Sequence, residues 1–556
     1  MRIGKTRRKN SSFKFVLLFL AVAVVGFFGV KFLFGPHEVP RAGELIFDAT
    51  LSQSEIDFVK NLLRNEDGTE QKFALPIKVS ARLSTTHEHL TFSELVPVTD
   101  WYSLEKSISP EDALKLPIQA STPVEPVENP VENSETTTTE TVAETPAVTY
   151  LLEPKSLNGN QKLLAIGANY YLDNTTKGAV YRVLELSLAS DADELSEASL
   201  KIVKEHASDQ KYQSAVFDDL ESFKSKLREK LPKSSENQVL TFAQTGVTAL
   251  SRAMVTRLNG AAGGNGAYFA ENIKDFLASK DLTHISNEVS FADSCPGGSD
   301  TVVLCADWRM LDAITAIGTD IIELTGNHNN DYGAQANLNT IAKYEELGLK
   351  TFGGGKDEET ARKPLEINQK GTNITLIGFN QSTTTAAYGG ANGATPGANL
   401  YNEAVAKQQI TEAKARGDFV IVDIQYYECY CYPEGGTEMP ACDSANNPAG
   451  EQAFFRHIAD LGADLVIGTQ AHQPQTYELY NGTQIYYGLG NLFFDQTYWP
   501  GTTRGLVLTH YFLNGNYAQT VISPTVYDTT YQTKLMDETT ADNFLRRLLN
   551  SSPRGA

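Results

Sequence analysis

The chain has 556 residues, too many for one ordinary domain, and this length predicts two or three domains. Hydrophobic residues make up 41% and aromatic residues 10%, which is enough for sizeable cores and excludes disorder throughout. The 47 basic and 68 acidic side chains give a net charge of −21, which argues against nonspecific binding to nucleic acid. The five cysteines include no CxxC pair, so a zinc ribbon or a thioredoxin-type motif is excluded.

The N-terminus predicts a membrane anchor. Residues 1–14 carry six basic side chains, and residues 15–34 form an apolar run that only Lys31 interrupts. About 20 apolar residues span a bilayer as a helix, and the basic flank stays in the cytoplasm. We therefore expect a cytoplasmic tail at 1–14, a single transmembrane helix at 15–34 and the rest of the chain outside the cell membrane. The alternative is a cleaved signal peptide, but the apolar run is long and no A-x-A site follows it.

Export places the cysteines in an oxidising environment. Cys295 and Cys305 bracket a Pro-Gly-Gly loop and are expected to pair. A second pair among Cys429, Cys431 and Cys442 would leave one thiol over, and metal binding by these three is the alternative.

Residues 117–148 are rich in Pro, Thr and Glu and show no apolar periodicity, which predicts a disordered acidic linker. The segments on either side, 42–116 and 149–235, alternate short strands with helical stretches. Their sequences ELVPVTDWYS and LNGNQKLLAIGANYYLD resemble parts of periplasmic solute-binding proteins. The resemblance implies one divided α/β domain, with the linker as an insertion between its halves.

From residue 237 onward, buried strands and helices alternate regularly and end in antiparallel hairpins. Strands are expected at 238–243, 320–324, 373–379, 419–425, 464–468, 475–479, 484–487, 505–512 and 517–527. Helices are expected at 335–347, 402–416 and 450–461, and Asn481-Gly482 and Asn514-Gly515 predict hairpin turns. This order predicts an α/β sandwich with helices outside, in which ligands gather where loops leave the carboxyl ends of the strands.

Polar motifs follow several of these strands. TGNHNNDYG places Asn327, His328 and Asp331 after the strand at 320–324, where an amide oxygen can hold a cation and an imidazole can donate a proton. Taken alone, this cluster is also ordinary turn chemistry. GADLVIGTQAH places His472 just past another strand, and YYGLGNLFFDQ contains Asn491. Glu288 follows the expected strand that contains His284, and His284 itself is expected to be a packed core histidine.

These motifs, in this order, resemble the family of CapA-type capsule and poly-γ-glutamate synthesis proteins. TGNHNNDYG is similar to the family pattern ANNHxxDYG, YGLGNLFFDQ to YSLGNFxFDQ, and GADLVIGTQAH to GADLVIGxHPH. Asn287-Glu288 is similar to the family's NLE, one residue out of register. The resemblance covers about residues 237–530 and implies a four-layer α/β/β/α sandwich related to calcineurin-like metallophosphoesterases.

Three departures from the family pattern affect metal binding. Thr245 stands where the family has an aspartate, and Gln425 and Gln470 stand where it has histidines. Thr and Gln supply only neutral oxygens, which are poor ligands for zinc or manganese. A two-metal phosphoesterase centre is therefore disfavoured, and either one divalent cation, zinc or manganese, or a metal-free pocket is expected. Asp423 and Glu428 are the residues that would compensate for the lost ligands.

The resemblance implies a role in making, anchoring or releasing an anionic surface polymer together with its synthesis machinery. His328 is the expected proton donor. The expected cation or anion site consists of Glu288, Asn327 and His472, and the expected substrate pocket of Asn287, Asp331, Gln425, Gln470 and Asn491. The alternatives are a non-catalytic polymer- or solute-binding surface protein, and a phosphodiesterase or nucleotidase supported by fold analogy alone.

Overall fold

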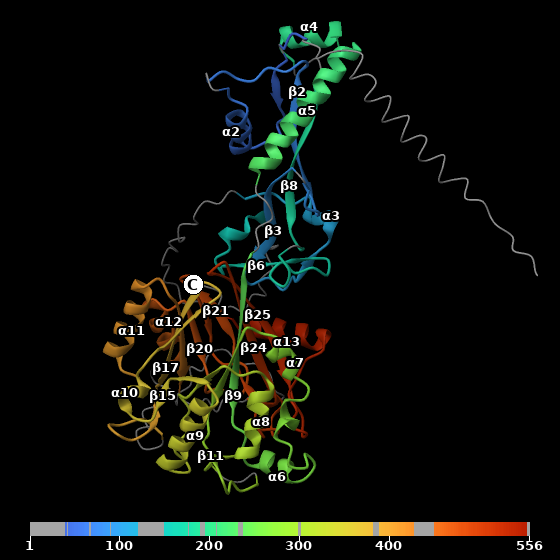
Figure 1. Ribbon diagram of the computed structural model, residues 1–556. Helices are drawn as coiled ribbons and strands as arrows, with labels where there is room; N and C mark the ends of the chain where they lie inside the picture. Colours follow the sequence, from blue (N-terminus) through green and yellow to red (C-terminus); the bar gives the residue numbers. More distant parts are fainter. Residues whose placement is uncertain are drawn as a thin grey trace, which may run out of the picture. The chain divides into compact units, whose positions relative to one another are not determined.

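The structure divides the chain into two compact units. One comprises Met1–Glu94 and Tyr181–Ser234, and the other Leu95–Val180 and Ser235–Ala556 (Figure 1). The computed structural model describes residues 39–41, 43–65, 68–88, 90–119, 149–175, 177–189, 195–206, 208–231, 237–298, 302–381, 389–426 and 450–552. The predicted tail and anchor at 1–34 lie outside these ranges, as do residues 120–148 of the predicted linker. Within these ranges, no helix has the length and apolar character needed to cross a membrane.

The first unit is a small α/β structure. Its elements are β1 (Leu45–Phe47), α2 (Gln53–Leu62), β2 (Ile77–Ser84), α4 (Glu197–His206), α5 (Gln210–Lys230) and most of β8 (Val180–Leu188). β1 and β2 are parallel, and β2 pairs antiparallel with β8. One side of α5, with Tyr212, Val216, Phe223 and Leu227, packs in a core with apolar residues of β2 and α2. The predicted likeness to solute-binding proteins over 42–116 and 149–235 stays a prediction.

The second unit begins with a segment that packs on the C-terminal sandwich. The elements of this segment are β3 (Thr91–Asp100, which crosses the unit boundary), β4 (Ser107–Ile108), α3 (Pro110–Ala113), β5 (Tyr150–Leu152), η1 (Pro154–Ser156), β6 (Gln161–Leu163) and β7 (Ala165–Ile166). The ring centroids of Trp101 and Tyr477 are 5.4 Å apart, and the Leu163 N–H donates to Gln519 Oε1 over 2.7 Å. Residues 95–180 therefore share contacts with the sandwich.

The first sheet of the sandwich has the strand order β14-β13-β10-β9-β24-β25-β26, and β23 also pairs with β9. Its strands are β9 (Val239–Thr248), β10 (Leu282–Asn287), β13 (Ile321–Glu323), β14 (Lys350–Phe352), β23 (Asn491–Phe493), β24 (Arg504–Leu513), β25 (Asn516–Val526) and β26 (Lys534–Leu535). β14, β13, β10, β9 and β23 pair parallel with one another, whereas the β9–β24, β24–β25 and β25–β26 pairs are antiparallel.

The second sheet has the order β16-β17-β19-β20-β22-β21. Its strands are β16 (Leu365–Gln369), β17 (Thr372–Asn380), β19 (Phe419–Gln425), β20 (Leu465–Gly468), β21 (Tyr477–Tyr480) and β22 (Thr483–Tyr486). β17, β19, β20 and β22 are parallel to one another. Two-residue ladders join β11 (Phe291–Ala292) to β12 (Ala306–Asp307) and β15 (Gly354–Gly355) to β18 (Gly397–Ala398).

Three apolar cores define the layers. Side chains from the facing sides of both sheets form the central core, among them Phe242, Leu282, Ile374, Ile421 and Ile467. The outer face of the first sheet packs against helices, and so does that of the second. The helices of the second unit are α6 (Ala253–Asn259), η2 (Gly266–Ala270), α7 (Lys274–Ala278), η3 (Trp308–Met310), α8 (Leu311–Ala316), α9 (Ala334–Glu346), α10 (Glu358–Ala361), α11 (Glu403–Ala415), α12 (Glu451–Asp460), η5 (Pro500–Thr503) and α13 (Glu538–Asn550).

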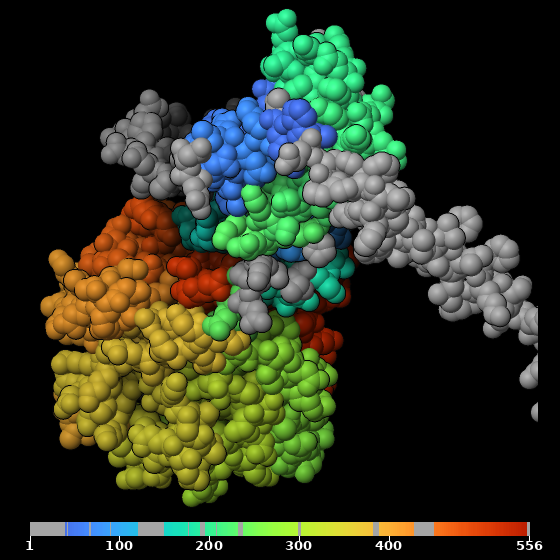
Figure 2. All heavy atoms as spheres, turned by 45° about the horizontal axis from the view of Figure 1, so that its top comes forward, coloured from blue at the N-terminus to red at the C-terminus, as the bar shows by residue number. Residues whose placement is uncertain are grey.

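Helices α11 and α12 lie on one side of the strands, and α7 and α8 lie on the other (Figure 1). The green-to-yellow and orange segments, which carry these outer helices, adjoin on the surface shown in Figure 2. The α/β/β/α layering predicted for 237–530 is thereby confirmed. Because side chains alternate along a strand, β19 directs Val422 and Ile424 to the outer core and Asp423 and Gln425 toward the other sheet.

Candidate functional site

The predicted site residues follow the carboxyl ends of parallel strands. Glu288 comes directly after β10, Asn327 and His328 come after β13, and Gln425 is the last residue of β19. Strand register aligns these ends, because Ser286 of β10 pairs with Glu323 of β13, and Asn380 of β17 pairs with Gln425. The loops that carry chemistry therefore leave each sheet at the edge where α/β sheets place their ligands.

Amide side chains connect the two sheets at this edge. The Gln425 amide Nε2 donates to Asn327 Oδ1 over 2.9 Å, and it also bonds the side-chain oxygen of Gln470. Asn380 Nδ2 donates to Gln425 Oε1 over 3.0 Å. The structure thus brings together three predicted residues, Asn327, Gln425 and Gln470. Asn380 was missed, because an asparagine at the end of a strand has no distinctive sequence signal.

Glu288 is the most unusual group of the site. Its side chain is buried, with 3% of the residue exposed, and neither carboxylate oxygen has a hydrogen-bond partner among the described residues. The loop after β13 is pressed against it, since a Cβ at Gly326 would lie 2.7 Å from Glu288 Cα. A buried carboxylate without partners is costly, which points to a ligand that compensates it. The neighbouring Asn287 instead fixes the local turn by donating to the Val289 carbonyl over 2.7 Å.

His472 and Asn491 meet as predicted. His472 Nδ1 lies 2.9 Å from Asn491 Oδ1, and Asn491 Nδ2 donates to the Thr502 carbonyl over 2.9 Å. Both side chains are buried. Asn491 belongs to β23, whose pairing with Val247 places it beside the end of β9. The hydrogen bond therefore fixes the imidazole ring at the same sheet edge.

Arg252 is a site component that the sequence reasoning missed. Its guanidinium lies 4.6 Å from the centroid of the Phe494 ring, and that ring is 5.2 Å from the His472 ring. The guanidinium forms an ion pair with Asp495, which also accepts the Ala253 N–H over 3.0 Å. Arg252 has a φ of 53°, a backbone conformation that side chains other than glycine seldom adopt. Its position just past β9 was the available signal.

His328 and Asp331 form a second pair. His328 Nδ1 is 2.6 Å from Asp331 Oδ2, and the same oxygen accepts the Leu304 N–H over 2.7 Å. The side chains are 24% and 13% exposed, so this pair is more open than Glu288 or His472. The bridge between Val289 and His328 places the pair next to the loop that carries Glu288.

A buried polar layer lies between the sheets, below these loops. Gln244 Nε2 lies 3.2 Å from both Asp423 oxygens, and Gln244 Oε1 lies 2.9 Å from His510 Nε2. His284 Nε2 is 3.2 Å from Asp423 Oδ2, but the two atoms are not aligned for a hydrogen bond. Burial and the neighbouring Asp423 raise the pKa of Glu323 to about 8. Burial and His284 lower the pKa of His510 to about 3.

Two residues that the sequence analysis connected with metal binding, Asp423 and Thr245, lie in or beside this layer. Asp423 is engaged between the sheets and does not reach the strand-end loops through any hydrogen bond found in the described structure. Thr245 lies within β9, three residues before its end, and donates to the His284 carbonyl over 2.9 Å. Glu428 lies outside the described residues. His284 is a packed core histidine, as expected, with 1% of the residue exposed.

Among the described residues, the donor set does not supply the anionic ligands that a two-cation centre needs. Within the part of the chain that the structure describes, no three His, Cys, Asp or Glu side chains are grouped to hold a metal ion. Gln425 and Gln470 offer neutral amides, and the Asn327 oxygen already accepts a hydrogen bond. Two cations need several anionic ligands to offset their repulsion. A single cation on Glu288, Asn327 and His472 stays a prediction.

Comparison with known proteins decides the family. Residues 241–496 match the family model described as bacterial capsule synthesis protein PGA_cap. This segment of the chain belongs to that family. We call it the CapA-type domain, and it contains all nine predicted site residues.

Two curated relatives resemble the CapA-type domain. The capsule biosynthesis protein CapA of Bacillus anthracis is 28% identical over 217 residues, which are 38% of this chain and 49% of the relative. The PGA biosynthesis protein CapA of Bacillus subtilis is 26% identical over 235 residues, which are 42% of this chain and 57% of the relative. The chain thus spans about half the length of the curated relatives it matches.

Among solved structures, the calcineurin-like phosphoesterase YfkN of Bacillus subtilis matches with 13% identity and a TM-score of 0.27. The match covers 56% of this chain and 98% of the other.

Proposed function

We propose that the chain is a membrane-anchored, extracytoplasmic protein that acts in the synthesis, anchoring or release of a capsule or poly-γ-glutamate-type surface polymer. The buried Glu288 carboxylate carries this proposal, because it lies without a hydrogen-bond partner among the described residues at the edge where the other site residues gather. The names of the curated relatives supply the class of polymer. The apolar run at 15–34 and its basic flank support the anchor.

The geometry supports His328 as the proton donor. Asp331 bonds the Nδ1 edge of its ring, so a proton passed to a ligand leaves from Nε2. The pair is partly exposed, which allows a polymer segment to reach the ring. The amides of Asn327, Gln425 and Gln470 would orient the segment by hydrogen bonds.

The test is complementation with the full chain in a bacterium from which the native copy has been deleted. His328→Ala is expected to abolish the surface polymer while the protein remains in the membrane. The matched control is His457→Ala, which removes an exposed imidazole paired with Glu403 on the outer helices. This control is expected to restore wild-type polymer. Wild-type polymer with His328→Ala would refute the proton-donor role.

A non-catalytic receptor for the same polymer is the second candidate. The neutral amide contacts among Asn327, Gln425 and Gln470 favour it, because amides bind ligands but do not transfer protons at neutral pH. Binding of purified polymer to the full chain distinguishes the two. A receptor loses affinity in His328→Ala, whereas an enzyme keeps binding and loses turnover.

A further inference from the structure

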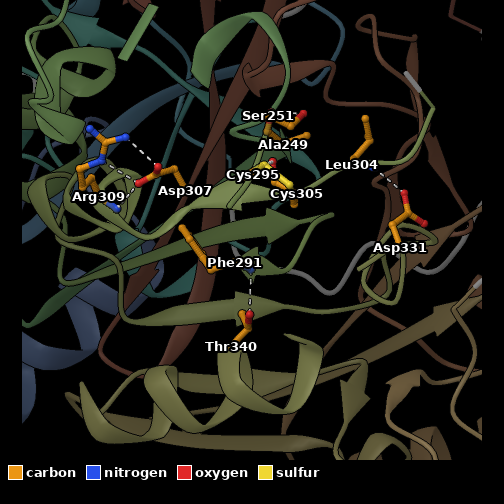
Figure 3. The surroundings of a disulfide bond; sticks show 10 residues. All are labelled: Ala249, Ser251, Phe291, Cys295, Leu304, Cys305, Asp307, Arg309, Asp331 and Thr340. Atoms are coloured by element: carbon orange, nitrogen blue, oxygen red, sulfur yellow. Dashed lines mark hydrogen bonds and ion pairs between the residues drawn. A yellow bond between two sulfur atoms is a disulfide. The ribbon is translucent and has the colours of Figure 1, made fainter. Parts of the chain in front are cut away.

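A disulfide lies next to the His328–Asp331 pair. Cys295 and Cys305 are bonded, as the sequence predicts, with their Cα atoms 5.7 Å apart. Leu304, the residue before Cys305, donates its N–H to Asp331 Oδ2 (Figure 3). Asp331 Oδ2 also bonds His328 Nδ1, so one carboxylate oxygen joins the disulfide loop to the imidazole.

We propose that this disulfide positions His328 for proton transfer. The covalent bond holds the Leu304 amide, the amide holds the Asp331 carboxylate, and the carboxylate holds the ring with Nε2 toward the ligand. Leu304 and Asp331 are then positioning residues and His328 is the catalytic residue. This inference rests on the proposed function, in which His328 donates a proton.

The surroundings of the loop show why a covalent link matters there. Val302 and Val303 are 80% and 47% exposed, so the chain just before Leu304 gains little from burial. The chain just after it pairs through β11 and β12, which form only two residue pairs. Such short ladders are marginal on their own, so burial of Ala306 in the core must also help to hold this part of the chain. The disulfide joins the chain around Leu304 and Cys305 to the first half of the loop, which begins at Cys295.

The first half of the loop is well anchored. A Cβ at Gly297 would lie 2.3 Å from Thr256 Oγ1, so this part of the loop lies directly against α6. Cys295 packs against the core under the first sheet, and Leu304 and Cys305 are buried in or beside the same core. The disulfide transmits this anchoring to Leu304, because the bond closes a loop with a sequence separation of 10 residues.

The direct test removes the Leu304 N–H and leaves the disulfide in place. Leu304→Pro deletes the donor, and Leu304→Ala is the matched control that keeps it. Each full-length variant is labelled with ring-¹⁵N histidine, and the His328 signal is identified by its loss in His328→Gln. We expect Nδ1 to carry a proton in wild type and Leu304→Ala, so that Nε2 is the atom that takes up and then delivers the transferred proton, and we expect a mixture of neutral tautomers in Leu304→Pro. In the complementation test, Leu304→Pro is expected to lower surface polymer toward the level of His328→Ala and Leu304→Ala to leave it unchanged, since a misplaced catalytic group costs about 100-fold in rate.

Cys295→Ser/Cys305→Ser is the second variant. It keeps the Leu304 N–H, and its His328 ring is expected to show the same mixture of tautomers as Leu304→Pro. An unchanged His328 signature in both variants would overturn the proposal. If the double serine variant does not fold, Leu304→Pro decides alone, after thermal melting confirms its fold. The ring signature does not depend on turnover. If the variants change the ring signature but the wild-type chain shows no polymer activity, the proposed function is refuted and the positioning role is kept.

Discussion

At the scale of single residues, the site places the unpartnered Glu288 carboxylate and a group of neutral amides at one sheet edge. Gln425 and Gln470 stand where the family resemblance places histidines, and their side chains contact each other. Amides satisfy one another by hydrogen bonding, whereas imidazoles at the same positions would present nitrogen ligands. We therefore expect the two glutamines to change what this sheet edge can hold.

Restoring the imidazoles should restore a metal site. In Gln425→His/Gln470→His, two imidazoles would lie together beside Asn327 and on the same sheet edge as Glu288, which is a ligand set that zinc accepts. We expect about one tightly held zinc ion per chain, measured by mass spectrometry after dialysis. The single variant Gln425→His should hold zinc much more weakly. Equal zinc in the double variant and the wild type would contradict this reading of the two glutamines.

The buried Glu288 carboxylate should lower the free energy of unfolding while it serves polymer binding. Glu288→Gln replaces a buried charge that has no hydrogen-bond partner among the described residues, so we expect the free energy of unfolding to rise by about 1–3 kcal/mol. The same variant should lose polymer binding. Thermal and denaturant unfolding of the full chain measures the first effect.

The matched control is the same change at a buried glutamate with partners. Glu478 is 2.7 Å from Arg456 and accepts the Tyr487 hydroxyl. Glu478→Gln should therefore lower the free energy of unfolding by about 3 kcal/mol, because it leaves a partly buried guanidinium uncompensated. Changes of the same sign in both variants would show that the Glu288 carboxylate is already compensated.

At the scale of elements, the hairpins follow local turn chemistry. Asn481-Gly482 and Asn514-Gly515 are predicted turns, and all four residues have positive φ. Their surroundings differ. A Cβ at Gly515 would lie 2.8 Å from the Gly371 carbonyl oxygen, whereas a Cβ at Gly482 would meet nothing closer than the Asn160 amide at 3.9 Å.

The two glycines therefore separate conformational strain from steric contact. Gly482→Ala should cost about 1 kcal/mol of unfolding free energy, the cost of placing an alanine in the left-handed region. Gly515→Ala should cost at least 1 kcal/mol more, because the added methyl also meets a backbone oxygen. Denaturant unfolding compares them, and equal costs would mean that the Gly371 turn yields freely.

Element positions were largely predictable because apolar periodicity and turn residues are local. The strand expected at 419–425 has the same bounds in the structure, and the helix expected at 335–347 runs from Ala334 to Glu346. β9 is the main exception, since it extends from the predicted end at 243 to Thr248. Gln244 and Thr245 do not look like buried strand residues in the sequence. Their partners, Asp423 and His284, lie far away in the chain and supply the hydrogen bonds that bury them.

At the scale of the whole molecule, the site could be predicted only as a set of strand ends. The sequence indicates which residues follow buried strands, and the sandwich brings those ends to one edge. Arg252 and Asn380 were missed because their roles depend on Phe494 and Gln425, which are distant in sequence. The polar layer between the sheets was missed for the same reason. It consists of side chains that alternate with apolar neighbours on ordinary strands.

That polar layer should set the pH dependence of stability for the molecule. The pKa of Glu323 rises from 4.5 to about 8 on folding, so between these values the unfolded chain releases a proton that the folded chain keeps. Stability therefore falls as pH rises through this window, by about 1.4 kcal/mol per pH unit. The pKa of His510 falls from 6.5 to about 3, so between these values only the unfolded chain binds the proton. Stability therefore falls as pH drops through that second window.

The two slopes oppose each other between pH 4.5 and 6.5, where stability should be highest and nearly flat. Melting temperatures of the full chain from pH 3.5 to 9 test this. Glu323→Gln should remove the decline between pH 6.5 and 8, because it removes the group that the folded state keeps protonated. His510→Gln should remove the decline below pH 4.5. If the melting temperatures of wild type and Glu323→Gln fall in parallel above pH 6.5, other groups cause the alkaline decline. The Glu323 carboxyl would then be ionised between the sheets at little cost in stability.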